Sequence, residues 1–175
     1  MFCIDPGHGG TNIGAMDGYE NKINLDIALR FEHLCQALGF PTKMTRRSET
    51  TVHPKERKDI CVGSSSVISI HHNASPRETE HGMRLFYWPS NKTAMYICNA
   101  AQSYAHPRLR SPTMVVPASE PYPGARGVCG LHDQTTVLVE CGFLTNPADL
   151  AFIQSDLYVD HMAVFLLQLA LHFIG

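Results

Sequence analysis

The sequence predicts a single α/β domain over residues 1–175, built on a mostly parallel, twisted sheet with helices on both faces. Short apolar runs typical of strands alternate with segments of helical periodicity. The run 135–139 is apolar or β-branched throughout, as in a parallel strand that is covered on both faces. With 175 residues, 44% of them hydrophobic, the chain suffices for one well-filled core and not comfortably for two.

Local signals place the individual elements along the chain. The first strand ends where a glycine-rich turn begins at Pro6, and the first helix ends at Gly39, ahead of Pro41. Strands are expected at 2–4, 40–45, 67–70, 83–87 and 135–139, and helices at 21–38, 55–62, 91–104, from Asn146-Pro147 onward, and at 156–173. The segment 105–134 is rich in proline and glycine, and either a substrate-lining loop or a poorly ordered one fits it.

Composition and charge exclude some classes of binding partner. The formal net charge is -2 and no basic patch is visible, so we expect no nucleic-acid binding. No membrane span is expected, because the most apolar run, 162–174, is too short to cross a bilayer. The chain enters its first strand without a charged and then apolar leader, so we expect synthesis in the cytoplasm without a cleavable signal peptide; a leader removed earlier is the alternative.

The cysteines carry no metal or redox motif. The six, none in a Cys-x-x-Cys pair, are Cys3, Cys35, Cys61, Cys98, Cys129 and Cys141. Most lie in apolar runs, which predicts buried free thiols and agrees with a reducing cytosol. A thiol enzyme using Cys141 or Cys129 is disfavoured, because Cys141 directly follows Glu140 and strand alternation aims it at the opposite face.

Three polar residues stand at the expected carboxyl ends of strands. These are His8, His71 and Glu140, and Glu20 lies at the end of the loop that follows His8. Because the carboxyl ends of parallel strands meet at one edge of a sheet, these side chains are expected to converge. Two imidazoles and a carboxylate with one open position match a hydrolytic zinc site, and the remaining carboxylate can act as a general base.

Each of these residues alone is weakly informative. A single histidine after a strand is more often a hydrogen-bonded structural residue than a ligand, and Glu20 could be a helix-capping carboxylate. His72 is adjacent to His71 and could replace it as a ligand on these grounds.

Four ordered blocks of sequence make the assignment more specific. They are Asp5-Pro-Gly-His-Gly-Gly10, Tyr19-Glu20 leading into 24–28, Ser69-Ile-His-His-Asn-Ala74, and Leu138-Val-Glu-Cys-Gly-Phe-Leu-Thr-Asn-Pro147. Together they resemble the signature blocks of the zinc-dependent N-acetylmuramoyl-L-alanine amidases of the amidase-3 type. The resemblance implies one zinc ion held by His8, Glu20 and His71, with Glu140 as the catalytic carboxylate, and it selects His71 over His72.

The same resemblance implies the reaction and the partners. The expected reaction is hydrolysis of the amide bond between N-acetylmuramic acid and L-alanine, with the glycan strand and stem peptide of peptidoglycan as partners. The chain is expected to come either from a phage or prophage endolysin or from a bacterial autolysin. Either enzyme would act on the cell wall after release or export. A separate wall-binding module outside this chain is possible. Arg57 and Asn73 are expected to position ligands or substrate.

The alternative is a non-catalytic peptidoglycan-binding or regulatory module with the same fold. The presence of all four candidate site residues argues against it, because an inactive copy has no reason to keep Glu140 at an apolar strand end. Three departures from the family pattern, at Asn12, at Cys61-Val62 and in a short stretch over 127–136, concern the groove more than the metal site.

Overall fold

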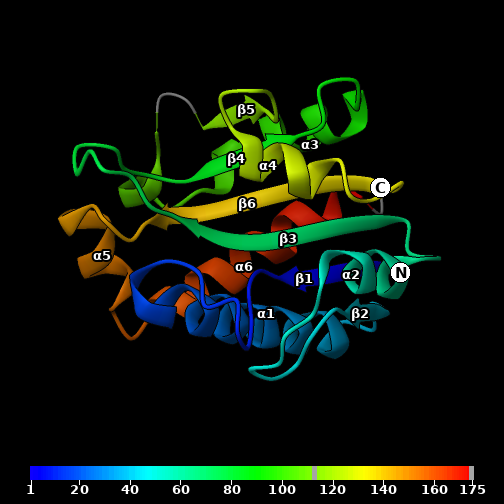
Figure 1. Ribbon diagram of the computed structural model, residues 1–175. Coiled ribbons are helices and arrows are strands. Elements are labelled where there is room, and N and C mark those ends of the chain that lie inside the picture. The colour runs from blue at the N-terminus through cyan, green and yellow to red at the C-terminus, as the bar shows by residue number, and fades with distance from the viewer. Residues whose placement is uncertain (112–113, 174–175) are drawn as a thin grey trace.

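The computed structural model describes residues 1–111 and 114–173, arranged around a six-stranded sheet with the order β2-β1-β3-β6-β4-β5 (Figure 1). The strands are β1 (Phe2–Pro6), β2 (Thr42–Met44), β3 (Ser66–Asn73), β4 (Arg84–Tyr87), β5 (Val115–Pro117) and β6 (Thr135–Phe143). Strands β2, β1, β3 and β6 run parallel to one another, whereas β4 is antiparallel to β6 and β5 is parallel to β4. The predicted fold class, a mostly parallel sheet, is confirmed.

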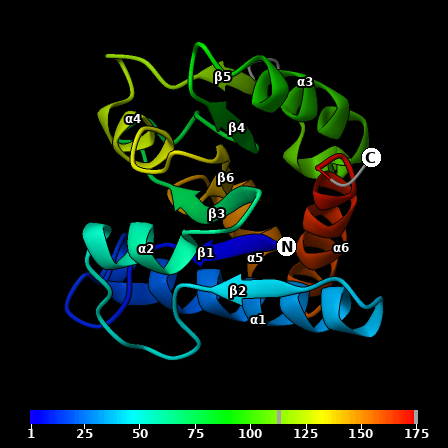
Figure 2. The ribbon, with the colours of Figure 1, turned by 90° about the vertical axis from the view of Figure 1, so that its right-hand side faces the viewer.

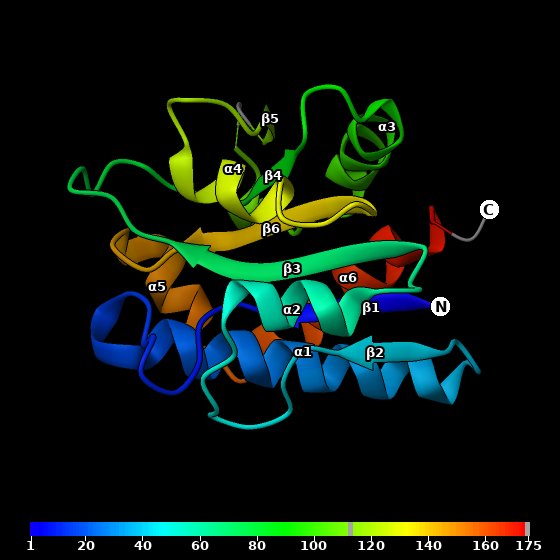
Figure 3. The ribbon, with the colours of Figure 1, turned by 45° about the vertical axis from the view of Figure 1, so that its right-hand side comes forward.

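Helices cover both faces of this sheet. They are α1 (Tyr19–Ala37), α2 (Pro54–Cys61), α3 (Lys92–Ala101), α4 (Pro123–Cys129), α5 (Pro147–Ile153) and α6 (Tyr158–Leu171), with 3-10 turns η1 (Met16–Gly18), η2 (Gln102–Tyr104) and η3 (Pro107–Leu109). Helices α2 and α4 lie on one face, and α1, α3 and α6 lie on the other (Figure 2). Figure 3 shows α2 in front of β1 and α4 in front of β6.

The main core lies between the sheet and the pair α1 and α6. Ile4 of β1, Ile68 of β3, Phe31 of α1 and Leu166 of α6 are all fully buried there. This explains why the sequence of α6 is apolar on most sides. No single helix of the described chain is long and apolar enough for a membrane span; α5 and α6 meet that test only together, across a bend of 91°. The predicted apolar run ends at Ile174, which lies outside the described residues.

Two strands extend further than the sequence predicts. Strand β3 continues to Asn73 and β6 to Phe143, so His71 and Glu140 lie inside strands and not just beyond them. The reason is continued pairing, because His71 stands in register with Glu140 before the pairing shifts. The segment that the sequence left uninterpreted, 105–134, contains η3, β5 and α4 in its described part.

The prediction of free thiols is wrong for two cysteines. Cys3 and Cys61 form a disulfide that joins β1 to the last residue of α2, with the two Cα atoms 5.5 Å apart. The partners are 58 residues apart, and only the packing of α2 on β1 shows that they meet. Cys35, Cys98, Cys129 and Cys141 are free and buried, as predicted.

Asp149 of α5 ties together the ends of two strands. Its buried carboxylate oxygen Oδ2 accepts hydrogen bonds from the main-chain N–H of Gly82, at 2.6 Å, and of Phe143, at 2.9 Å. Gly82 lies just before β4, and Phe143 is the last residue of β6. Asp149 therefore fixes how these two strands lie at one edge of the sheet.

We expect Asp149→Ala to lower the free energy of unfolding by about 2–4 kcal/mol, because two buried N–H groups would lose a charged acceptor. Asp149→Asn keeps an acceptor oxygen at the same place and should lose less. Denaturant unfolding monitored by circular dichroism measures both variants. Equal losses for the two would contradict the assigned role.

Candidate metal centre

The turn after β1 carries His8 in a backbone conformation that L-residues rarely adopt. Its φ is 62°, in the left-handed region, which costs free energy for any residue with a Cβ atom. The main-chain N–H of Gly7 donates to the carbonyl of Ile70, and the N–H of Gly9 donates to the carbonyl of Asn12. The turn is thereby tied to β3 on one side and closed on itself on the other.

Two buried arginines hold the carbonyls of this turn. Arg57 of α2 donates to the carbonyls of Pro6, at 2.8 Å, and His8, at 2.5 Å. Arg46 donates to the carbonyls of Pro6, at 3.0 Å, and Gly7, at 2.7 Å. Three successive carbonyls are therefore bound by guanidinium groups, and the strained turn is fixed from outside.

Asp5 holds Arg57 in place. Its carboxylate accepts hydrogen bonds from Arg57, Thr45 and Ser69, at 2.6, 2.7 and 2.8 Å. Burial on its own would raise the pKa of Asp5, but the Arg57 charge and these hydrogen bonds outweigh it and lower that pKa. The sequence suggested a positioning role for Arg57, and its bonds to the His8 turn agree with that. The positioning role expected for Asn73 stays a prediction.

Three predicted ligands converge at this turn. Glu20, buried in the first turn of α1, places Oε1 3.0 Å from His8 Nε2 and 3.3 Å from His71 Nδ1. One ligand atom from each residue lies within 4.8 Å of the others. Donors bound at about 2.0 Å around a tetrahedral ion stand about 3.3 Å apart, so this cluster fits a single divalent cation.

The charges of the cluster favour a cation. Burial on its own would raise the pKa of Glu20, but hydrogen bonds from His71 and His8 outweigh it and hold that pKa far below its usual value. Burial would lower the pKa of His8, yet the contact with Glu20 prevails and raises it. The carboxylate is thus ionised and stabilises positive charge next to it.

His72 does not join the cluster. In its buried ring, Nδ1 lies 2.8 Å from Asn24 Oδ1, and Nε2 lies 2.7 Å from the Tyr158 hydroxyl oxygen. Burial lowers the pKa of His72 to about 3, so the ring stays neutral. Alternation along β3 sends His71 and His72 to opposite faces, which resolves the alternative that the sequence left open.

Glu140 lies beside the cluster, in register with His71 across the β3–β6 pair. Its Oε2 atom is buried and has no hydrogen-bond partner among the described residues. Burial raises the pKa of Glu140 to about 7, although the nearby His71 acts to lower it. A carboxyl group that titrates near neutral pH and has a free oxygen is suited to exchange protons with a bound molecule.

A cavity of about 370 Å³ opens beside the two histidines. One wall includes His8, His71 and Arg57, and the other includes Gly124, Gly127 and Leu131, in and just after α4. A Cβ atom at either glycine would meet nothing within 4 Å, so α4 presents open backbone there. Part of the segment 105–134 therefore lines the groove, which agrees with one of the two alternatives for it.

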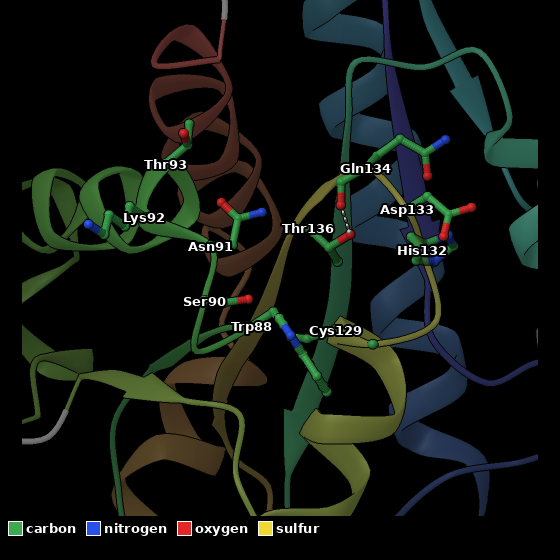
Figure 4. Close-up of a pocket in the computed structure, with 11 residues that line it drawn as sticks. Trp88, Ser90, Asn91, Lys92, Thr93, Cys129, His132, Asp133, Gln134 and Thr136 are labelled. Carbon is green, nitrogen blue, oxygen red and sulfur yellow. Dashed lines mark hydrogen bonds between the residues drawn. The ribbon is translucent and has the colours of Figure 1, made fainter.

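A larger cavity of about 570 Å³ lies at the opposite edge of the sheet (Figure 4). Trp88 and Asn91 line one side of it, and Thr136 and Gln134 line the other. None of the four predicted site residues borders this cavity.

The cysteines do not offer a nucleophile. Cys141 is fully buried, and burial raises the pKa of its thiol well above the usual value. Burial likewise raises the pKa of Cys129 to about 12. A reactive cysteine needs a thiolate and access, so the thiol alternative is not supported.

The fold and the site together define a class of protein: an α/β domain with two histidines and a carboxylate gathered at one edge of a parallel sheet, next to an unpaired glutamate. A family model described as N-acetylmuramoyl-L-alanine amidase matches residues 2–168. The chain belongs to this family, and it is an amidase of the class whose members act on bacterial cell walls.

Curated relatives agree with the family. The germination-specific N-acetylmuramoyl-L-alanine amidase of Bacillus subtilis is 28% identical, over 93% of this chain and 75% of the relative. The amidase LytC of Bacillus subtilis is 27% identical, over 91% and 32%, and the probable cell wall amidase LytH of Staphylococcus aureus is 26% identical, over 90% and 52%. The chain thus spans about three quarters of the germination-specific amidase, a third of LytC and half of LytH.

Solved structures show the same fold. The catalytic domain of the amidase CwlV from Bacillus (Paenibacillus) polymyxa superposes with a TM-score of 0.84 at 23% identity, covering 98% of this chain and 96% of that one. The CwlD amidase from Clostridioides difficile, solved in complex with the GerS lipoprotein, gives 0.85 at 22% identity with the same coverage.

We expect Arg57→Met to weaken metal binding by roughly 10- to 100-fold, because the carbonyls of Pro6 and His8 lose the Arg57 donors and only the Arg46 bonds to the turn remain. Arg57→Lys keeps the charge without the planar guanidinium group, so its metal affinity should lie between those of the unmodified protein and Arg57→Met. Lys58→Met, on the same helix with its side chain in an exposed pair with Asp133, is the matched control. Competition with a chromogenic chelator measures the affinities, and an unchanged affinity in Arg57→Met would disprove the role.

Proposed function

We propose that this chain is a zinc-dependent amidase that hydrolyses the bond between N-acetylmuramic acid and L-alanine in peptidoglycan. The observation that carries the proposal is the convergence of His8, Glu20 and His71 with Glu140 in register beside them. Family membership over residues 2–168 supports the reaction. That residues 1–175 form the whole catalytic domain stays a prediction.

His8, Glu20 and His71 would hold the zinc ion. Two imidazoles and one carboxylate are a donor set of hydrolytic zinc sites that keep a position open for water or substrate. When bound there, zinc lowers the pKa of the attacking water and polarises the scissile carbonyl. Glu20 also accepts a hydrogen bond from the main-chain N–H of Ala15, at 2.8 Å, through its other oxygen, which fixes the carboxylate.

Glu140 would move the proton. In its ionised form it accepts a proton from the attacking water as the water oxygen bonds to the carbonyl carbon. It then returns this proton to the amide nitrogen as the carbon–nitrogen bond breaks. The products are a muramic acid carboxylate and a stem peptide with a free L-alanine amine.

We expect Glu140→Gln to keep the metal and to lose at least 100-fold in hydrolysis, because the amide cannot take up the proton. His8→Ala should lose both metal and activity, and His33→Ala, at an exposed position of α1, should lose neither. Mass spectrometry of digested peptidoglycan, searching for stem peptides with a new L-alanine amine, measures activity. Comparable digestion by Glu140→Gln would show that the base is another group.

Activity is expected to fall on acidification as Glu140 becomes protonated, because only the ionised form accepts the proton from water. Burial raises the pKa of Glu140 to about 7 in the protein alone, and a cation beside it would lower this pKa. The acidic limb of the kcat/KM profile should therefore lie below about pH 7. Glu140→Gln should lack this limb in its residual activity, and a limb that persists would assign it to another group.

We also propose that the protein is made in the cytoplasm and acts on the cell wall after release or export, as an endolysin or an autolysin. The Cys3–Cys61 disulfide is consistent with a final site outside a reducing cytosol. A wall-binding module outside this chain is also proposed; LytC and LytH are longer than the part that this chain matches, which leaves room for a further segment in those relatives. A non-catalytic wall-binding module, the other candidate, would bind peptidoglycan and release no stem peptide.

A further inference from the structure

Arg84 lies next to the proposed proton-transfer group on the neighbouring strand. It is the first residue of β4 and stands directly opposite Glu140 in the antiparallel pair with β6. Residues directly opposite each other in such a pair point to the same face of the sheet. Glu140 is in register with His71 on its other side, so the three side chains share one face.

The guanidinium of Arg84 has no acceptor in the described protein. Its Nε atom is buried without a hydrogen-bond partner, and no ion pair joins Arg84 to Glu140 or to another described carboxylate. Its Cζ atom lies 4.5 Å from the centre of the Phe143 ring, so the guanidinium group packs on the face of that ring. A buried Nε–H group without an acceptor is costly, and a bound ligand would supply one.

The proposed reaction indicates which part of the substrate lies near Arg84. Glu140 returns a proton to the nitrogen of the L-alanine that leaves, so the stem peptide must begin beside Glu140. The α-carboxyl carbon of the second stem residue is five bonds beyond this nitrogen, on the order of 6 Å in an extended peptide. The Cβ atoms of directly opposite strand residues lie about 4.5–5.5 Å apart, and the long arginine side chain extends from that position, so this carboxyl group is within reach of Arg84.

We propose that Arg84 determines specificity by binding the free α-carboxylate of the second stem-peptide residue, D-isoglutamate. This rests on the proposed amidase function. An arginine fork binds a carboxylate through two parallel charged hydrogen bonds. In stems amidated to D-isoglutamine, the charge is lost and an NH2 group takes the place of one oxygen. The enzyme therefore prefers non-amidated stems.

The test compares kcat/KM for two purified muropeptides that differ only in D-isoglutamate against D-isoglutamine. The expected preference of the unmodified enzyme for the carboxylate is about tenfold or more, the range of a charged hydrogen bond. Arg84→Met, which keeps a long side chain over Phe143, should bring the ratio close to one, and Arg84→Lys should keep part of it. Arg30→Met, on α1 in an exposed pair with Asp160, should keep the full preference.

Other outcomes would overturn the assignment. Equal rates on both muropeptides, or the same loss on both in Arg84→Met, would mean that Arg84 acts through Glu140 or the fold. For stems whose third residue carries its own free carboxylate, a third muropeptide amidated only there separates that group from the carboxylate of the second residue. A preference that follows the third residue would also contradict the proposal.

A binding measurement separates this inference from the proposed function. The affinities of Glu140→Gln and of Glu140→Gln/Arg84→Met for the two muropeptides are measured by calorimetry, without turnover. A preference of about tenfold that disappears in the double variant supports the role of Arg84, whatever the rate of hydrolysis. Equal affinities in Glu140→Gln overturn it, whereas absence of the L-alanine amine after digestion by the unmodified enzyme overturns the proposed function.

Discussion

The site depends on the binding of main-chain carbonyls by two buried guanidinium groups. His8 has a left-handed backbone, and the turn that carries it contains several glycines and little apolar side-chain surface of its own. Arg46 and Arg57 bind the carbonyls of residues 6, 7 and 8, and Asp5 neutralises one of these charges. The position of the first histidine is therefore set by the charged hydrogen bonds of Arg46 and Arg57, more than by the turn itself.

Two glutamates with similar chemistry have opposite surroundings. Glu20 accepts from two imidazoles and two main-chain N–H groups, which keep it ionised despite its burial. Glu140 is partly buried, its buried oxygen has no hydrogen-bond partner among the described residues, and its pKa rises toward neutrality. One carboxylate is thus suited to stay charged and hold a cation, and the other to exchange a proton. The division of roles follows from what each side chain touches.

Much of the fold and the site could be predicted because the signals were local. Glycine, proline and asparagine mark the element ends, and His8, His71 and Glu140 follow apolar runs at the edge where parallel strands end. Packing between distant segments could not be read in this way. The disulfide of Cys3 and Cys61, the position of α4 over the groove and the unpaired state of Arg84 all require knowledge of which layers meet. Strand alternation indicates that His71 and His72 face opposite sides of the sheet, but the choice between them needed the resemblance or the packed structure.

The reversed direction of β4 has a consequence for the composition of the site. Because β4 runs against its neighbour β6, it delivers its first residue, Arg84, to the edge where the parallel strands deliver their last ones. The cation donors come from β3, α1 and the turn after β1, so they share no element with Arg84. A substitution at Arg84 would therefore leave the three cation donors unchanged, but it would alter the surroundings of Glu140, because burial raises the pKa of that carboxyl group and the Arg84 charge acts to lower it.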